Sequence, residues 1–284
     1  MATDPMIVRS KVGDFIRRNP TIVVGGTLLI LITLAALLAP LIARYPIAFE
    51  PINRLKGPSA DFWLGTDSLG RDVYARMIYG ARISLMVGLL VALISIISGA
   101  VIGLLAGYFS KVDAVVMRLM DGIMAIPSIL LAIALVALLG SSVKVVIIAI
   151  AIPEIPRVAR LVRAVVLSVR DLPFVEAARS NGTRVTKLLR RHILPSTIAP
   201  LIVQATYICA SAILAEAGLS FLGAGTPPEF PTWGNMIASS RLYLQIAPWT
   251  IFAPGICLAL MVLAVNLLGD GLRDRLDPRI SRRM

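Results

Sequence analysis

The chain has 284 residues, of which 57% are hydrophobic and only 15% are charged. This apolar content exceeds what the core of a soluble domain of this length needs, so the excess must face lipid, and an ordinary soluble fold is excluded. The net charge of +12 would suggest nucleic acid as a partner of a soluble protein, but here basic cytoplasmic loops that attract anionic lipid explain it.

Six segments are long and apolar enough to cross a bilayer. A hydrocarbon core about 30 Å thick needs about 20 apolar residues per helix. The clearest segment covers residues 22–43 and carries no charge. The others cover residues 83–108, 114–139, 143–167, 197–217 and 248–268. We therefore predict an all-α integral membrane protein with about six transmembrane helices.

The N-terminal segment, residues 1–21, is basic, and a basic flank before an apolar run is also typical of a cleaved signal peptide. The apolar run is longer than a normal signal core, and no small-x-small cleavage site follows it, so we predict a retained helix. Val8, Val12, Phe15 and Ile16 have helical spacing. This spacing suits a short interfacial helix, with a disordered tail as the alternative.

Basic residues predict the orientation, because cytoplasmic loops retain Lys and Arg. With the N-terminus inside, 20 of the 28 Lys and Arg residues fall in cytoplasmic segments. We therefore predict that both residues 1–21 and the tail, residues 273–284, are cytoplasmic. The three tryptophans, Trp63, Trp233 and Trp249, then lie on the outer side, which suits an interfacial aromatic belt.

The predicted extracytoplasmic loop, residues 44–82, contains a segment dense in turn formers and capping side chains. Asp67 and Asp72 can cap backbone amides, and Arg71 can pair locally. The residues alone predict only a structured turn before an amphipathic helix. The candidate residues of this outer-loop motif are Gly65, Thr66, Asp67, Gly70, Arg71 and Asp72.

Small residues and prolines characterise the later helices. Gly99, Gly103 and Gly107 repeat every four residues, which predicts close approach of another helix. Prolines within or beside the spans predict kinks and free carbonyl groups, which are tolerated where they face protein or water. These prolines are Pro127, Pro153, Pro156 and Pro254. Several bent helices indicate a conduit rather than an anchor.

Ionisable residues within membrane helices are costly and usually face a partner or a water path. Glu154 either lines a pathway or pairs with Arg157 or Arg160 at a helix interface. Glu216, near the outer end of the fifth predicted helix, is a candidate for a structural role near a gate. Asp121 is three residues from Arg118, which predicts that these two side chains pair with each other.

The segment of residues 171–195 carries the strongest local signal. Its pattern predicts one short helix that ends at Gly182 and a second over residues 185–192 that Pro195 stops. The hairpin is basic, too polar for lipid and too short for a domain. A docking site for a partner is therefore the leading interpretation, and a solvated basic loop is the alternative.

Several kinds of chemistry are excluded within this chain. None of its five lysines follows a glycine, so the Gly-Lys step of a P-loop is missing. His192 is the only histidine, which excludes His-x-x-x-His zinc chemistry. Cys209 and Cys257 lie in apolar segments and are expected to be packing residues. We therefore expect no catalytic residue, no metal site and no cofactor in this chain.

The hairpin resembles the EAA loop of importer-type ABC permeases. The matching residues are Glu176, Ala177, Ala178, Gly182, His192, Leu194 and Pro195. The general pattern has Ile where this chain has His192, a variant that resembles the peptide and nickel permease branch. Further matching segments are residues 65–72, 117–121, 219–223, 233–234, 266–274 and 276–279. The pattern is similar to the DppC/OppC type of subunit and covers about residues 60–280.

The resemblance implies a type I ABC importer permease fold, with a core over residues 83–272 and a cytoplasmic coupling hairpin at residues 171–195. It implies a location in a bacterial or archaeal cytoplasmic membrane. It also implies four partners: a second, DppB/OppB-like permease, two ATPase subunits that use ATP and Mg²⁺, and an external substrate-binding protein. The expected substrates are di- or oligopeptides.

Alternatives remain at this stage. A related permease for nickel, glutathione or another small substrate shares these motifs. A stand-alone ion-coupled carrier would need acid or histidine relays and internal repeats, and an intramembrane enzyme would need a nucleophile with a base. The sequence offers Glu154 alone as a relay and no histidine within a span.

Overall fold

The structure is a computed structural model that describes residues 16, 19–43 and 49–276. The described residues form helices and connecting loops without a strand. The expected interfacial helix before residue 17 and the end of the tail, residues 277–284, lie outside the described part. The helices are α2 (Pro20–Leu37), α3 (Ala39–Ile42), α4 (Val73–Tyr108), α5 (Ser110–Ala125), α6 (Ser128–Leu139), α7 (Val143–Val169), α8 (Pro173–Ser180), α9 (Val185–Leu188), α10 (Leu194–Phe221), α11 (Trp233–Ser240) and α12 (Trp249–Leu276).

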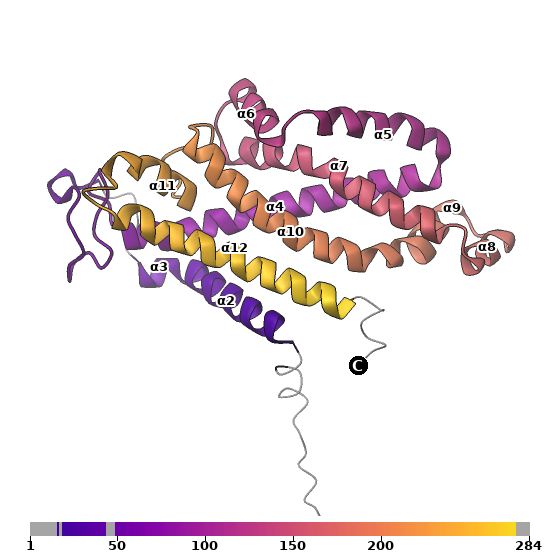
Figure 1. Ribbon diagram of the computed structural model, residues 1–284, viewed down its shortest axis with the longest axis horizontal. Helices are drawn as coiled ribbons and strands as arrows, with labels where there is room; N and C mark the ends of the chain where they lie inside the picture. Colours follow the sequence, from indigo (N-terminus) through magenta and orange to yellow (C-terminus); the bar gives the residue numbers. More distant parts are fainter. Residues whose placement is uncertain (1–15, 17–18, 44–48, 277–284) are drawn as a thin grey trace, which may run out of the picture.

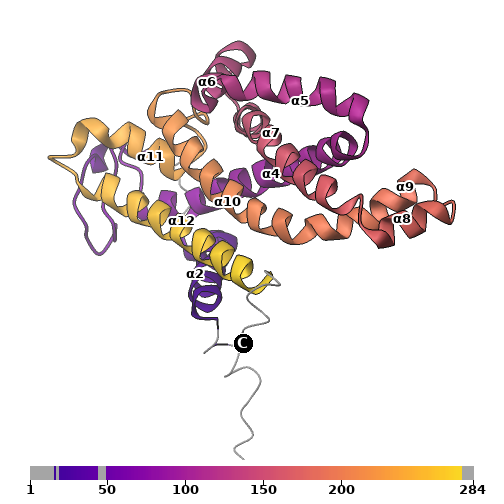
Figure 2. The same cartoon turned by 45° about the vertical axis from the view of Figure 1, so that its right-hand side comes forward.

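The long helices run roughly along one direction and give the molecule two ends (Figure 1). One end carries α8 and α9, and we call it the hairpin end. The other carries residues 49–72 and α11, and we call it the loop end. Figure 2, a turned view, shows α5 and α6 outside α4 and α7, while α2 lies beside α12 on the other side. Between them α10 packs against α4, α7 and α12.

The observed helix bounds differ from the expected spans at several points. The second expected helix begins at Val73 instead of residue 83, so the loop before it ends at residue 72. The last helix continues to Leu276, beyond the expected start of the tail. The segment expected as one helix over residues 114–139 is broken into α5 and α6, which are bent by 89°. Pro127 lies in this break, where it lacks the amide hydrogen that would continue the helix.

Four helices, α2, α4, α10 with its preceding turns, and α12, are long and apolar enough to cross a membrane, or five with the bent pair α5 and α6. The expected number was about six. The difference arises at α7, a helix of 27 residues whose central part contains both acidic and basic side chains. Its sequence contains Lys144, Glu154, Arg157, Arg160 and Arg163.

The glycines of α4 let α7 approach closely, as expected. A Cβ atom at Gly99 would lie 2.5 Å from Cβ of Val158, and one at Gly103 would lie 2.5 Å from the carbonyl oxygen of Ala159. Gly107 faces Val166 in the same way. Because the contacts advance in the same direction along both helices, α4 and α7 are parallel. The pair forms the centre of the larger hydrophobic core.

The second core lies toward α2, α12 and the loop end. Cys209 and Cys257 are free thiols that pack against it, as expected of packing residues. Trp233 is only 1% exposed and belongs to this core, so it does not contribute to an interfacial belt. Its Nε1 donates to the carbonyl oxygen of Met77, 3.0 Å away. The expectation that Trp233 belongs to an interfacial aromatic belt is therefore wrong, because its indole is buried and connects α11 with α4.

Candidate functional site

The hairpin end is built around a turn at Gly182. Helix α8 begins at Pro173, whose fixed φ suits a first helical position. At its end the amide of Gly182 donates to the carbonyl oxygen of Arg179 at 3.0 Å, and the amide of Thr183 donates to that of Ala178 at 3.1 Å. This pair of hydrogen bonds is a Schellman motif, which places its glycine in the left-handed region. Gly182 has φ +71°, as the sequence predicted.

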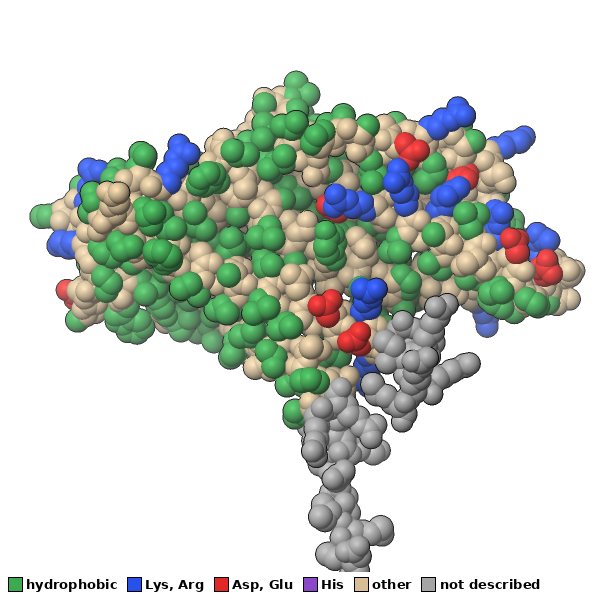
Figure 3. Space-filling model, in the orientation of Figure 1, with side chains coloured by type: hydrophobic (Ala, Val, Ile, Leu, Met, Phe, Trp, Pro, Cys, Tyr) green, Lys and Arg blue, Asp and Glu red, His purple; other side chains and the backbone are tan. Residues whose placement is uncertain are grey.

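Two buried side chains fasten the hairpin to the helix bundle. Val175 of α8 is 2% exposed and Leu188 of α9 is 1% exposed, and both belong to the same core as α4 and α7. Glu176 and Ala177 are exposed on the outside of α8, while Ala178 is partly buried. The hairpin is therefore a projection that is anchored to the core, and Glu176 and Ala177 face outward. Figure 3 shows charged side chains from the centre of the view to the hairpin end and a few at the loop end, with a mainly hydrophobic surface between the two groups.

The second short helix does not stop at Pro195, and that expectation is wrong. The chain continues from α9 through a π-helical segment, Leu189–Ile193, directly into α10. His192 lies in this π-helical segment, and Leu194 and Pro195 form the first turn of α10. The missing amide hydrogen of a proline is tolerated in a first turn, and the wider π-helical turn before it accommodates the ring.

The outer-loop motif forms a compact turn at the loop end. Oδ1 of Asp67 accepts from the amides of Leu69 at 2.8 Å and Arg71 at 2.9 Å. Its Oδ2 accepts from Nε of Arg71 at 2.7 Å and lies 3.7 Å from Nε of Arg76. Asp72 caps α4 by accepting from the amide of Tyr74. The predicted capping and local pairing are thus present.

The other residues of this motif hold the turn against its neighbours. Thr66 is fully buried, and its carbonyl oxygen accepts from Nε1 of Trp249 at 3.2 Å. Gly65 and Gly70 have φ of +70° and +77°. A Cβ at Gly70 would lie 1.8 Å from the carbonyl oxygen of Glu50, so only glycine fits there.

Glu216 is a buried acid that connects α10 with the segment before α11. Its Oε1 accepts from the hydroxyls of Ser220 at 2.8 Å, Thr226 at 3.2 Å and Thr232 at 2.9 Å. Thr232 also caps α11 by accepting from the amide of Asn235. The cluster has the structural character expected of Glu216, and a role in gating stays a prediction.

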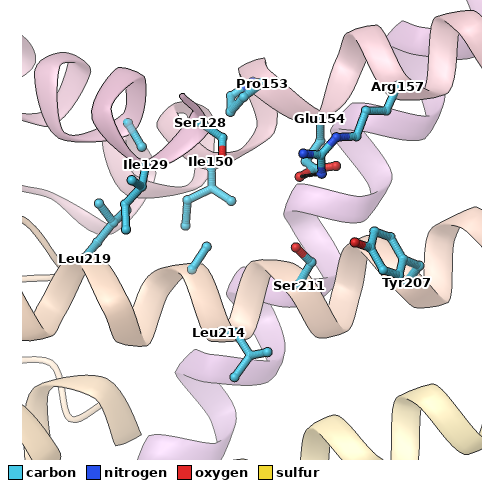
Figure 4. Close-up of a pocket in the computed structure, with 12 residues that line it drawn as sticks. Ser128, Ile129, Ile150, Pro153, Glu154, Arg157, Tyr207, Ser211, Leu214 and Leu219 are labelled. Atoms are coloured by element: carbon cyan, nitrogen blue, oxygen red, sulfur yellow. Dashed lines mark hydrogen bonds and ion pairs between the residues drawn. The ribbon is translucent and has the colours of Figure 1, made fainter. Parts of the chain in front are cut away.

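Glu154 lies away from both ends, near the middle of α7. Its Oε1 accepts from Nη1 of Arg157 at 2.8 Å, which is one of the two expected pairings. The same side chain also lines a cavity of about 370 Å³ between α6, α7 and α10 (Figure 4). Glu154 can therefore pair with Arg157 and line a pathway at the same time.

Asp121 pairs with Arg160 of α7, so the expected pairing with Arg118 is wrong.

The structure keeps the sequence-predicted residues in separate places. The EAA residues share the hairpin, the outer-loop motif and Glu216 lie toward the loop end, and Glu154 lies between. Sequence reasoning did not single out Tyr207 and Ser211, which line the cavity opposite Glu154, or the buried Arg76. The two hydroxyls are four residues apart on an apolar helix, and that spacing places them on one face.

Comparison with known proteins agrees with this architecture. Residues 99–282 match the model of the family described as binding-protein-dependent transport system inner membrane component. Residues 15–58 match the N-terminal transmembrane domain of oligopeptide transport permease C. The inward-facing methionine ABC transporter MetNI has the same fold, with a TM-score of 0.57 at 17% identity over 71% of this chain and 96% of that chain.

Curated relatives are similar over nearly the whole length. A probable peptide ABC transporter permease of Sinorhizobium fredii is 59% identical, over 98% of this chain and 96% of that protein. The dipeptide transport system permease DppC of Alkalihalophilus pseudofirmus is 45% identical, over 94% and 88%. The glutathione transport system permease GsiD of Pectobacterium atrosepticum is 42% identical, over 94% and 89%. The chain therefore belongs to the binding-protein-dependent transport system inner membrane component family and is a multi-pass permease subunit of an ABC importer.

Proposed function

We propose that this permease forms half of the pathway of an ATP-driven peptide importer. It pairs with a second homologous permease, and two ATPase subunits hydrolyse ATP with Mg²⁺. An external binding protein delivers di- or oligopeptides. The peptide substrate is supported by the relatives named for peptide and dipeptide transport. The relative named for glutathione transport makes that tripeptide the second candidate.

The observation that carries the proposal is the hairpin of α8 and α9. Its turn is closed by the Schellman hydrogen bonds at Gly182, and its buried residues fasten it to the bundle core. Glu176 presents a carboxylate to a basic group of a partner, and the adjacent Ala177 leaves room for close contact. An exposed projection that is anchored to the core in this way suits docking to an ATPase surface.

The test of the function is purification of the tagged chain from its native membrane in mild detergent. We expect a second permease and ATPase subunits to accompany it, and Mg²⁺-dependent ATP hydrolysis to rise when the binding protein and its peptide are added. The affinity of that binding protein for di-, tri- and longer peptides, glutathione and nickel complexes identifies the substrate. A chain that transports peptide while purifying alone would contradict the proposal.

The proposed orientation places the hairpin end in the cytoplasm and the loop end outside. In a variant without Cys209 and Cys257, we expect Lys187→Cys to resist a membrane-impermeant maleimide in intact cells and to react after permeabilisation. Ala60→Cys, at an exposed position of the loop end, is the matched control and should react in intact cells. The opposite labelling pattern would overturn the orientation.

A further inference from the structure

The cavity that Glu154 lines has a polar wall and an apolar wall. It lies between α6, α7 and α10 and has a volume of about 370 Å³. Figure 4 shows the hydroxyls of Ser211 and Tyr207 beside each other on the side of α10 that faces the Glu154 and Arg157 pair of α7. Ser128 adds a third hydroxyl from the start of α6, and Ile150 and Leu219 contribute apolar surface. A volume of roughly 300–1,000 Å³ is typical of small-molecule sites.

One carboxylate oxygen of Glu154 has a hydrogen-bond partner, and the other has none among the described residues. Its side chain is 7% exposed, and Oε1 is paired with Arg157. Oε2 is buried and has no hydrogen-bond partner among the described residues. A buried carboxylate oxygen without a donor is costly and uncommon in folded proteins. Glu154 is one of the residues that line the cavity, so a donor bound there lies beside this carboxylate and can satisfy it after a small rotation of the terminal torsion.

The chemistry of the cavity selects the kind of donor. The guanidinium of Arg157 is 41% exposed, so solvent weakens its charge more than that of the buried carboxylate. The carboxylate of Glu154 therefore keeps part of its negative charge toward the cavity, and the hydroxyl oxygens of the lining are further acceptors. An ammonium group has three donors and one positive charge, which match this set.

We propose that this cavity binds the ammonium group of the transported solute, with the carboxylate of Glu154 as the main acceptor and the hydroxyls of Tyr207 and Ser211 as further acceptors. The inference rests on the proposed import of peptides, whose free N-terminus is such a group. The site is near the middle of α7 (Val143–Val169), remote from the hairpin and from the outer-loop motif. It gives the permease a selectivity of its own, separate from that of the binding protein.

The test measures protection of a cysteine in this cavity, without the binding protein. The reporter is Ala215→Cys, which lines the cavity, in the purified transporter lacking Cys209 and Cys257. We expect the dipeptide Ala-Ala to slow its reaction with N-ethylmaleimide and N-acetyl-Ala-Ala, which has no ammonium group, to protect only at concentrations about tenfold higher or more. Glu154→Gln keeps the shape of the side chain and should remove the difference between the two peptides.

The matched control is Asp121→Asn, which neutralises another carboxylate that pairs with an arginine of α7 but does not line the cavity. Protection by Ala-Ala should be unchanged in that variant. Stimulated ATP hydrolysis, measured for every variant, reports whether the transporter is assembled. Equal protection by both peptides, no protection by either, or unchanged discrimination in Glu154→Gln would overturn this inference. If the assembled transporter itself is absent, the proposed function fails instead.

Discussion

Gly182→Val is expected to abolish transport while the protein still inserts at a near-normal level. The turn between α8 and α9 requires φ near +71°, and a β-branched side chain is strongly disfavoured in this region. A Cβ atom at Gly182 would meet no atom within 4 Å, so the backbone conformation rather than a clash causes the effect. The cost of about 1–2 kcal/mol or more for a left-handed L-residue falls on a single exposed turn. We expect the Schellman motif to open and the two helices to lose their alignment.

Peptide uptake in cells, with the membrane level of the chain and the amount of co-purified ATPase measured alongside, tests this prediction. Uptake should fall at least about tenfold if docking loses about 1.4 kcal/mol. Gly182→Asn is the matched control, because asparagine tolerates the left-handed region better than other residues with a side chain. It should keep most of the uptake. Normal uptake and normal ATPase recovery in Gly182→Val would remove the hairpin from the coupling mechanism.

Asp67→Ala is expected to destabilise the loop end severely. The change removes the acceptor of two backbone amides and the charge that faces Arg71 and Arg76. Arg76 is 3% exposed, and Asp67 is its one ion-pair partner within the described residues. Removing one member of a buried pair costs about 3–5 kcal/mol, a large part of a typical net stability of about 5–15 kcal/mol. We expect lower yield, a lower unfolding temperature and impaired transport.

Two further variants separate the causes. Asp67→Asn keeps an oxygen that can accept from the amides but removes the charge, so its loss of stability reports mainly on Arg76. Asp61→Ala changes an exposed acid of the same loop and should alter stability by less than about 0.5 kcal/mol. Thermal unfolding of the purified complex and binding of ATP are the measurements. Unchanged unfolding in Asp67→Ala, or a loss confined to ATP binding, would refute the structural role of this motif.

The helices of this fold were largely predictable, because a membrane-spanning helix is recognised in a sequence by the length of its apolar run. The start of α4 was placed too late, because the uncharged apolar run begins only at Ile83. Arg76 is in fact buried beside Asp67 within the first turn of α4. The break between α5 and α6 was predicted as a kink at Pro127, but its angle depends on how α6 packs on α7 and α10. That packing is a tertiary property.

The candidate site was predictable where the signal is local. The turn at Gly182 follows from glycine at a helix end, and the caps of Asp67 and Asp72 follow from their position before backbone amides. Pairing between helices was not predictable in the same way. Asp121 has Arg118 three residues away, yet it pairs with Arg160, which is distant in sequence. The choice is made by the packing of α5 on α7.

The continuous helical stretch from α9 into α10 connects the hairpin directly with the cavity. The helical stretch Val185–Phe221 has 37 residues and is about 55 Å long at about 1.5 Å per residue. It begins in the hairpin and passes the cavity at Tyr207 and Ser211. Ser211 lies about 40 Å along this stretch, so a tilt of about 5° at its base displaces that residue by about 3.5 Å. A displacement of this size is enough to break a hydrogen bond, so we expect a tilt of the hairpin to change the contacts of the Ser211 hydroxyl in the cavity.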